Sequence, residues 1–170
     1  MPRRLQAWYG FSELAAFGDR GAELTGDLKV AQLTRLHSLL HTDAGEIVAV
    51  RAKLGRTNRG QLMMSLSFDV KLKLVCQRCL EPVEIAVDEQ VEWGVVESES
   101  ERAALASGVD ALVLEDERIQ LAALVEDEII LSLPMVPRHA SIDECGALAQ
   151  NLKPFLRMHE RAPLGTTLKV

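Results

Sequence analysis

The residues with the most chemical potential in this 170-residue chain are two cysteines in the segment Val75–Pro82. Cys76 and Cys79 form a Cys-x-x-Cys pair, which is the spacing of half a zinc site. A structural zinc site takes four ligands, usually supplied as two close pairs. The third cysteine, Cys145, and His139 are the residues that we expect to complete such a site. The same pattern is also compatible with two thiols that only shape a turn, or with thiol–disulfide chemistry.

Redox chemistry is the least favoured of these three readings. Redox Cys-x-x-Cys pairs lie at a helix N-terminus, which lowers the pKa of the thiol, whereas strand-like segments flank this pair on both sides. If zinc is bound, Asp143 and His159 are alternatives to His139 as the fourth ligand. The expected cofactor is therefore none, or a structural zinc.

A second polar motif, Glu126-Asp127-Glu128, lies in an otherwise apolar segment. Three carboxylates can bind a divalent cation, as they do in nucleases. Consecutive helical residues point about 100° apart, however, so these three side chains cannot converge on one ion by themselves. No phosphate-binding glycine loop follows a strand, and the four histidines are scattered. We therefore predict no catalytic residues and no enzymatic activity.

The cysteine pair lies between segments in which apolar residues recur at every second position. Such alternation is typical of strands with one buried face. Strands are predicted at 23–30, 46–54, 62–75, 83–96 and 110–114, and helices at 31–41 and 121–133. The N-terminal segment 12–17 has a weaker helical pattern. The fold class that follows is α+β, with a mainly antiparallel sheet, either a meander or a partly closed barrel, and two helices packed on it. We expect an N-terminal arm over 1–20, one domain over 21–138 and a C-terminal tail over 139–170.

The predicted helix 121–133 has an apolar stripe that should dock on the sheet. Helical spacing places Leu121, Leu124, Val125 and Ile129 in this stripe, and it places Glu128 among them. A buried carboxylate is costly unless it is paired, so we expect Glu128 either to meet a cation or to reach solvent at the rim. The candidate cations are Arg78 of the cysteine turn and the lysines and arginines of the strands.

Charge is divided unevenly along the chain. The net charge is −6, but residues 1–80 carry +5 and residues 81–170 carry −11. Six cations could form a basic surface on the sheet, where they would contact RNA phosphates rather than bases: Arg51, Lys53, Arg56, Arg59, Lys71 and Lys73. The acidic stretch 81–128 could instead bind a basic protein. We expect a cytoplasmic protein, because the sequence has no apolar signal segment and no stretch long enough to span a membrane.

The two motifs together resemble the bacterial YceD family of large ribosomal RNA subunit accumulation proteins. The resemblance rests on Cys76-Gln77-Arg78-Cys79-Leu80-Glu81-Pro82 and on the segment 124–134 with Glu126, Asp127 and Glu128, followed by a Pro-x-x-Pro-x-His step that ends at His139. It covers roughly residues 22–145. Some relatives have further C-terminal cysteines that suggest a four-thiolate zinc site, whereas this chain has only Cys145 there.

The resemblance implies a role in the synthesis, processing or stability of large-subunit ribosomal RNA, and it brings no established enzyme activity. We therefore expect a non-enzymatic ribosome-biogenesis factor. Its partner should be a basic ribosomal protein or the RNA itself, with no membrane and no small-molecule substrate. A basic protein is slightly favoured, because an acidic protein binds a polyanion poorly. The alternatives are a metal-dependent RNA-processing enzyme and a zinc-stabilised protein-interaction module.

Overall fold

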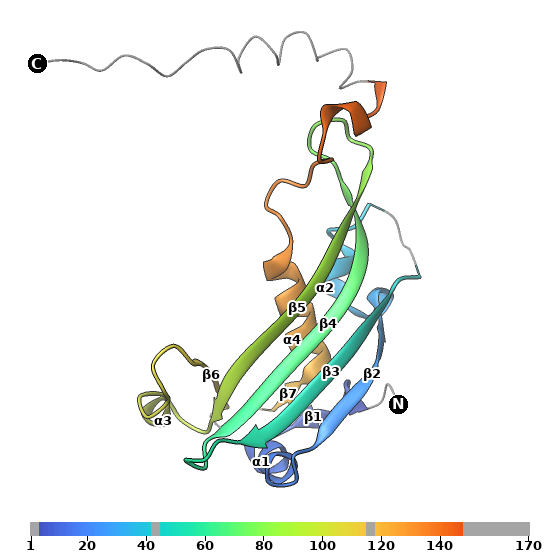
Figure 1. The fold of residues 1–170 in the computed structure, drawn as a ribbon. Coiled ribbons are helices and arrows are strands. Elements are labelled where there is room, and N and C mark those ends of the chain that lie inside the picture. Colours follow the sequence, from blue (N-terminus) through green and yellow to red (C-terminus); the bar gives the residue numbers. More distant parts are fainter. Residues whose placement is uncertain (1–3, 42–44, 115–117, 148–170) are drawn as a thin grey trace, which may run out of the picture.

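The computed structural model describes residues 4–41, 45–114 and 118–147 of the chain. Its main element is a five-stranded sheet in the order β2-β3-β4-β5-β6 (Figure 1). Strands β2 to β5 form an antiparallel meander, whereas β6 runs parallel to β5. The strands are β2 (Glu23–Lys29), β3 (Ile47–Arg56), β4 (Leu62–Val75), β5 (Pro82–Val96) and β6 (Asp110–Val113).

The sheet is open, so the prediction of a partly closed barrel is wrong. Its two outer strands, β2 and β6, do not pair with each other. The meander prediction holds for the first four strands only. The segment between β5 and β6 includes one short helical turn, and a connection of this length lets the chain return to start β6 parallel to β5.

One face of the sheet is buried and the other is open. The alternating apolar residues of β3, β4 and β5 lie on the buried face, where Met64, Leu66 and Leu72 are fully inaccessible to solvent. The residues between them are mostly exposed. We call this second surface the open face, and its exposed members include Asp27, Arg51, Lys53, Asp69, Lys71 and Asp88.

The buried face is covered by helices (Figure 1). The structure has four α-helices in the described residues where the sequence predicted two, and two of the four are single turns: α1 (Phe11–Asp19), α2 (Thr34–His37), α3 (Glu99–Arg102) and α4 (Leu121–Ser132). Helix α4 was predicted with its N-terminal residue correct and its end within one residue. Its residues Leu121, Val125 and Ile129 are fully buried in the core. Within the described residues, no helix has the length and apolar character that crossing a membrane requires.

The predicted helix 31–41 is mostly absent. Its place is taken by a 3-10 turn at Val30–Gln32 and by the four-residue α2. Leu33 and Leu36 are buried, whereas His37 is exposed. Leu33 occupies the N-cap position of α2, and leucine has no side-chain oxygen to accept from the first free amides. A helix without a local cap is costly to begin, and this one continues for a single turn.

The segment from Arg4 to Tyr9 packs on α4 and on the residues that lead into it. Strand β1 (Trp8–Tyr9) pairs with β7 (Ile119–Gln120), immediately before α4. Leu5 is fully buried, and its carbonyl accepts a hydrogen bond from the amide of Ala122. The N-terminal segment from Arg4 onward therefore contributes to the same core as the sheet.

Strands β4 and β5 form a long hairpin that extends past the helices (Figure 1). Cys76 and Cys79 lie in the turn at its tip. After α4, the chain runs alongside this hairpin to the same tip, where it forms a 3-10 turn at Ile142–Glu144. The amide of Gln77 donates to the carbonyl of Pro137 at 2.8 Å, which joins the two segments. The fold thus brings Cys76 and Cys79 next to residues that follow them by about 60 positions in the sequence.

Candidate functional site

Four potential metal ligands meet at the tip of the hairpin. The Sγ atoms of Cys76, Cys79 and Cys145 and a ring nitrogen of His139 all lie within 4.8 Å of one another. We call these four residues the Cys/His cluster. They are the residues that the sequence predicted as a zinc set. Within the described residues, this is the one group of three or more cysteine, histidine or acidic side chains that converges in this way.

The cysteine side chains of this cluster are buried and are not bonded to one another as disulfides. The environment affects two of the thiols in opposite directions. Burial opposes ionisation of Cys76, but the backbone amides of His139, Arg78 and Cys79 face its sulfur, and the net effect lowers its pKa to about 5. Burial raises the pKa of Cys145, against a hydrogen bond from Arg78. The alternative fourth ligand Asp143 is exposed, and His159 lies outside the described residues.

Arg78 contacts the Cys/His cluster and not α4. Its Nε donates to Cys145 Sγ at 3.0 Å. One of its terminal nitrogens donates to the carbonyls of His139 and Ser141, at 2.9 and 2.8 Å. The predicted contact between Arg78 and Glu128 is therefore absent, because the guanidinium is directed at the segment that follows α4.

The buried carboxylate of α4 is Glu126, which the sequence placed outside the apolar stripe. Its side chain is 8% exposed, while Glu128 is only partly buried. The stripe is rotated relative to the prediction, and it consists of Leu121, Ala122, Val125, Glu126 and Ile129. Leu124 is correspondingly only half-buried. Helix α4 is apolar around most of its circumference, so the residue spacing alone did not fix which side faces the core.

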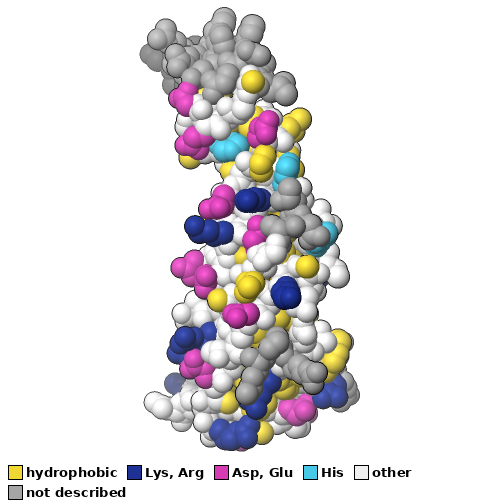
Figure 2. Space-filling model, turned by 90° about the vertical axis from the view of Figure 1, so that its right-hand side faces the viewer, with side chains coloured by type: hydrophobic (Ala, Val, Ile, Leu, Met, Phe, Trp, Pro, Cys, Tyr) yellow, Lys and Arg dark blue, Asp and Glu magenta, His cyan; other side chains and the backbone are white. Residues whose placement is uncertain are grey.

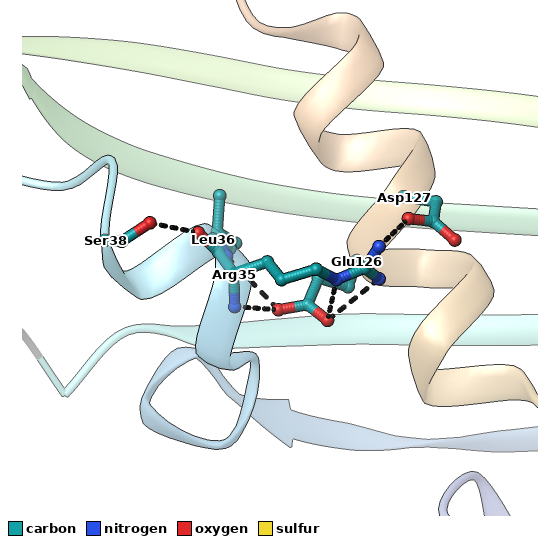
Figure 3. A network of polar contacts seen from close by, with 5 residues as sticks. All are labelled: Arg35, Leu36, Ser38, Glu126 and Asp127. Carbon is teal, nitrogen blue, oxygen red and sulfur yellow. Dashed lines mark hydrogen bonds and ion pairs between the residues drawn. The ribbon is translucent and has the colours of Figure 1, made fainter.

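Glu126 caps α2 from a distance of about 90 residues in the sequence (Figure 3). One carboxylate oxygen accepts from the backbone amides of Arg35 and Leu36, at 2.7 and 3.1 Å. The other accepts from Nε and a terminal nitrogen of Arg35, at 3.1 and 3.0 Å. Asp127 pairs with the remaining terminal nitrogen of Arg35. Sequence reasoning missed Arg35, because nothing in its local pattern distinguishes it from a surface cation.

This network argues against a divalent-cation site at the Glu126-Asp127-Glu128 motif. Both oxygens of Glu126 are occupied by donors, and Asp127 is held by Arg35. A divalent cation would have to displace a guanidinium and two helix amides to bind here. The geometry therefore supports a structural role for the first two carboxylates of the motif and gives no support to a nuclease centre.

Glu128 lies on the outer side of α4 among other acidic groups. Burial, and then the charges of Asp127, Asp110 and Glu89, raise its pKa above the ordinary value. Leu131 follows Glu128 by three positions on the same helix and is 76% exposed. We call the surface formed by Glu89, Asp110, Asp127, Glu128 and Leu131 the α4 acidic face.

The six cations predicted to bind RNA do not form one basic patch. Arg51, Lys53, Lys71 and Lys73 lie on the open face, whereas Arg56 and Arg59 lie at and beyond the end of β3. Lys53 pairs with Ser65 across the sheet, so Lys71 lies six residues, or about 20 Å, farther along β4. The cations are therefore spread along the length of the sheet.

Acidic side chains alternate with these cations. Arg51 pairs with Glu23 at 3.3 Å, Lys71 pairs with Glu84 at 3.5 Å, and Arg56 pairs with Asp19. Figure 2 shows side chains of both signs interspersed on one side of the molecule.

The middle of the open face is acidic. Asp27, Asp69 and Asp88 lie in one row across the sheet, and they line a shallow hollow of about 450 Å³. Asp69 and Asp88 are direct partners in the strand register. This row separates Arg51 and Lys53 at one end of the open face from Lys71 and Lys73 at the other.

A protein-family model matches the part of the chain that contains most of the features described above. The model described as large ribosomal RNA subunit accumulation protein YceD matches residues 64–159, which is more than half of the chain. The match includes the β4–β5 hairpin, helix α4 and all four residues of the Cys/His cluster. No solved structure matches this chain. The chain belongs to the YceD family of large ribosomal RNA subunit accumulation proteins.

Proposed function

We propose that this protein is a non-enzymatic ribosome-biogenesis factor that supports accumulation of large-subunit ribosomal RNA by binding a basic ribosomal protein. Membership of the YceD family supports the general role, which is accumulation of the large ribosomal RNA. The observation that carries the choice of partner is the α4 acidic face, where carboxylates crowd one another beside an exposed leucine. The proposed partner contributes lysine or arginine side chains to this face and apolar contacts to Leu131.

The electrostatics of the α4 acidic face favour a cationic partner. Like charges close together disfavour the ionised form, and this repulsion is part of the reason why the pKa of Glu128 is raised. A bound lysine or arginine would remove the repulsion and gain a favourable ion pair. Complementary charge of this kind speeds encounter and excludes partners of the wrong sign.

The surface also has the mixed character of a protein-binding site. Leu131 is exposed on α4, and Met135 and Val136 are exposed in the turn that follows the helix. Exposed apolar side chains next to charged groups are typical of interaction surfaces, where the apolar residues contribute affinity and the charges contribute specificity. RNA phosphates would be repelled by the carboxylates and would gain little from these apolar side chains.

Direct binding assays on the full chain separate the two kinds of partner. Purified large-subunit ribosomal proteins and fragments of large-subunit RNA would each be titrated at several salt concentrations. We expect binding to at least one basic ribosomal protein, weakening as salt is raised because surface charges are screened. The substitution Glu128→Lys should weaken this binding at least tenfold.

The matched control is Asp27→Lys, which makes the same change of charge on the open face and should leave protein binding intact. Binding of RNA fragments with no binding of ribosomal proteins would contradict the proposed partner. RNA binding that is lost on Lys71→Glu would assign the contact to the open face instead. Hydrolysis of RNA with added Mg²⁺ or Mn²⁺, abolished by Asp127→Ala, would contradict the non-enzymatic role.

A further inference from the structure

We propose that the Cys/His cluster is a structural zinc site, with Cys76, Cys79, Cys145 and His139 as its four ligands and Arg78 as the residue that balances its charge. The site would join the tip of the β4–β5 hairpin to the segment that follows α4. This inference concerns how the molecule is held together, and it does not depend on which partner binds the α4 acidic face.

The first support is the convergence of four soft or borderline ligands from three places in the sequence. Two cysteines come from the hairpin turn, His139 comes from the extended segment after α4, and Cys145 follows the 3-10 turn at Ile142–Glu144. Thiolate and imidazole are the ligands that zinc takes in structural sites, and a set of three cysteines and one histidine is a common combination. Oxygen ligands, which Mg²⁺ and Ca²⁺ prefer, are absent from the set.

Two distances within the cluster match those of a tetrahedral zinc site. Nδ1 of His139 lies 3.6 Å from the Sγ atoms of both Cys79 and Cys145. Bonds of about 2.3 Å to sulfur and 2.0–2.1 Å to nitrogen, at a tetrahedral angle, place the two ligand atoms about 3.6 Å apart. The imidazole nitrogen is thus at the expected separation from two of the three sulfurs at once.

The orientation of His139 leaves the correct nitrogen available. Its Nε2 lies 3.2 Å from the carbonyl oxygen of Pro82, which can only accept a hydrogen bond. Nε2 must therefore carry the proton, and the lone pair of Nδ1 faces the sulfurs. A ligating histidine usually donates its second N–H to a carbonyl or carboxylate in this way, which fixes both the tautomer and the ring orientation.

The position of Arg78 fits the charge of a site with three thiolates. A zinc ion with three thiolates and a neutral imidazole carries one net negative charge, which is costly in a buried position unless it is compensated. The Arg78 guanidinium donates to Cys145 Sγ at 3.0 Å and to the carbonyls of His139 and Ser141. Arg78 thereby supplies one positive charge and holds the backbone on which His139 lies.

The hairpin turn has the backbone of a metal-binding loop. Leu80, directly after Cys79, has a φ of 63°, a left-handed conformation that costs a residue with a side chain about 1–2 kcal/mol. Its amide donates to the carbonyl of Cys76 at 2.9 Å, and backbone amides face the Cys76 sulfur. A strained residue persists where the surroundings determine the conformation, and this one lies directly after the second cysteine of the turn.

The ligand set assigns the site a structural and not a catalytic role. A catalytic zinc keeps a coordination position open for water or substrate, whereas four protein ligands close the tetrahedron. The thiol–disulfide alternative lacks the helix N-terminus that activates redox cysteines, because the pair lies between β4 and β5.

The decisive experiment is elemental analysis of the full-length protein purified under reducing conditions without chelators. We expect about one zinc per chain, as one four-ligand site requires. Replacement of zinc by Co²⁺ should give the visible absorption bands of a tetrahedral site with thiolate ligands. Cys145→Ser and His139→Asn should each lower the bound zinc severalfold and weaken or alter these bands.

Two control substitutions test the assignment of the fourth ligand. His159→Asn and Asp143→Asn remove the alternatives and should leave the zinc content unchanged. Circular dichroism would establish that each variant is folded, and the measurement on the unmodified chain stands even if a variant is not. A chain without metal, whether its thiols are free or in a disulfide, would overturn the proposal. Iron in place of zinc, or full zinc retention in both ligand variants, would also overturn it.

Discussion

At the scale of single residues, Leu80 is unusual because it is strained and exposed at once. Its φ is 63° and its side chain is 66% exposed, so the side chain contributes little packing to offset the backbone cost. Among the described residues it is the one non-glycine residue with a positive φ. Glycine adopts this conformation without steric cost, which makes the position a direct test of the turn geometry.

Leu80→Gly should therefore stabilise the protein. We expect a gain of about 1 kcal/mol from relief of the left-handed strain, reduced in part by the greater backbone entropy of glycine in the unfolded chain. Urea denaturation followed by circular dichroism would measure it. Gln77→Gly in the same turn, where φ is not positive, is the matched control and should destabilise. A loss of stability in Leu80→Gly would mean that the leucine side chain makes a contribution that its exposure does not indicate.

Glu126 is the residue whose loss should be most damaging in the α4 motif. Glu126→Ala would leave the amides of Arg35 and Leu36 without an acceptor in a mostly buried position, and we expect a cost of about 2–4 kcal/mol. Arg35→Ala should cost less, because the guanidinium is half exposed and Glu126 would keep both amide donors. Chemical denaturation of the two variants checks the order. Equal losses of stability in the two variants would show that α2 is held by the ion pair between Arg35 and Glu126, and not by the hydrogen bonds from its backbone amides to Glu126.

Glu128 should behave in the opposite way to Glu126. Its pKa is raised, so the folded state disfavours the ionised carboxylate, and Glu128→Gln should increase stability at neutral pH. We expect a gain of no more than about 0.5 kcal/mol, because the group is largely solvated. The gain should be full above the raised pKa of the folded state and should disappear as pH falls below the ordinary carboxyl pKa. Denaturation curves of Glu128→Gln and the unmodified chain, measured across this pH range, would test the expected direction. A stability gain that grows as the pH is lowered would contradict it.

At the scale of elements, the strands were the most predictable part of the fold. Alternation placed β4 and β5 within one residue of their observed ends, because each has one buried and one open face over most of its length. The predicted bounds of β2 and β6 are also within one residue of the observed ones. Three of the four residues in the predicted stripe of α4, Leu121, Val125 and Ile129, are fully buried, but the carboxylate on the buried side is Glu126 and not Glu128. Apolar residues occur on all sides of this helix, so their spacing did not identify the buried carboxylate. The cap that Glu126 gives to α2 depends on a contact across about 90 residues, and no local pattern carries that information.

The candidate site was predicted by residue type but not by geometry. Cysteine and histidine are the usual zinc ligands, so Cys145 and His139 could be selected from the sequence. The role of Arg78 could not, because it depends on where the chain turns after α4. The cationic surface was predicted from parity, which is the rule that every second side chain of a strand lies on the same face. This rule correctly placed Lys71 on the open face. Parity also places Asp69 of β4 on the open face, whereas the alignment of Asp27 and Asp88 with it depends on the strand register.

At the scale of the whole molecule, the described residues form two apolar clusters. The larger lies between the sheet and the helices, and it includes Leu66 and Ile129. The smaller lies at the hairpin tip and consists of Leu74, Cys76, Cys79, Val83 and Cys145. A cluster of five residues buries little apolar surface, so the tip should depend on the proposed zinc more than the main core does.

Removal of the proposed metal should therefore loosen the tip and leave the core intact. Hydrogen exchange measured by mass spectrometry, with and without a strong chelator, would follow each region. We expect exchange in 76–82 and 137–146 to accelerate at least tenfold on chelation, while amides of β3 and the buried half of β4 keep their protection. Acceleration throughout the sheet would mean that the tip and the core unfold as one unit. Unchanged exchange at the tip would show that no metal supports it.

The protein combines an α+β body, a hairpin tip that carries the proposed zinc site, and the α4 acidic face. The central proposal is that the α4 acidic face supports accumulation of large-subunit ribosomal RNA. The most direct measurement is the ratio of large-subunit to small-subunit ribosomal RNA in cells that lack the protein, complemented with the unmodified chain, Glu128→Lys or Asp27→Lys. We predict a lowered ratio in the deletion, restored by the unmodified chain and by Asp27→Lys but not by Glu128→Lys. Full restoration by Glu128→Lys, at equal protein levels, would contradict the account.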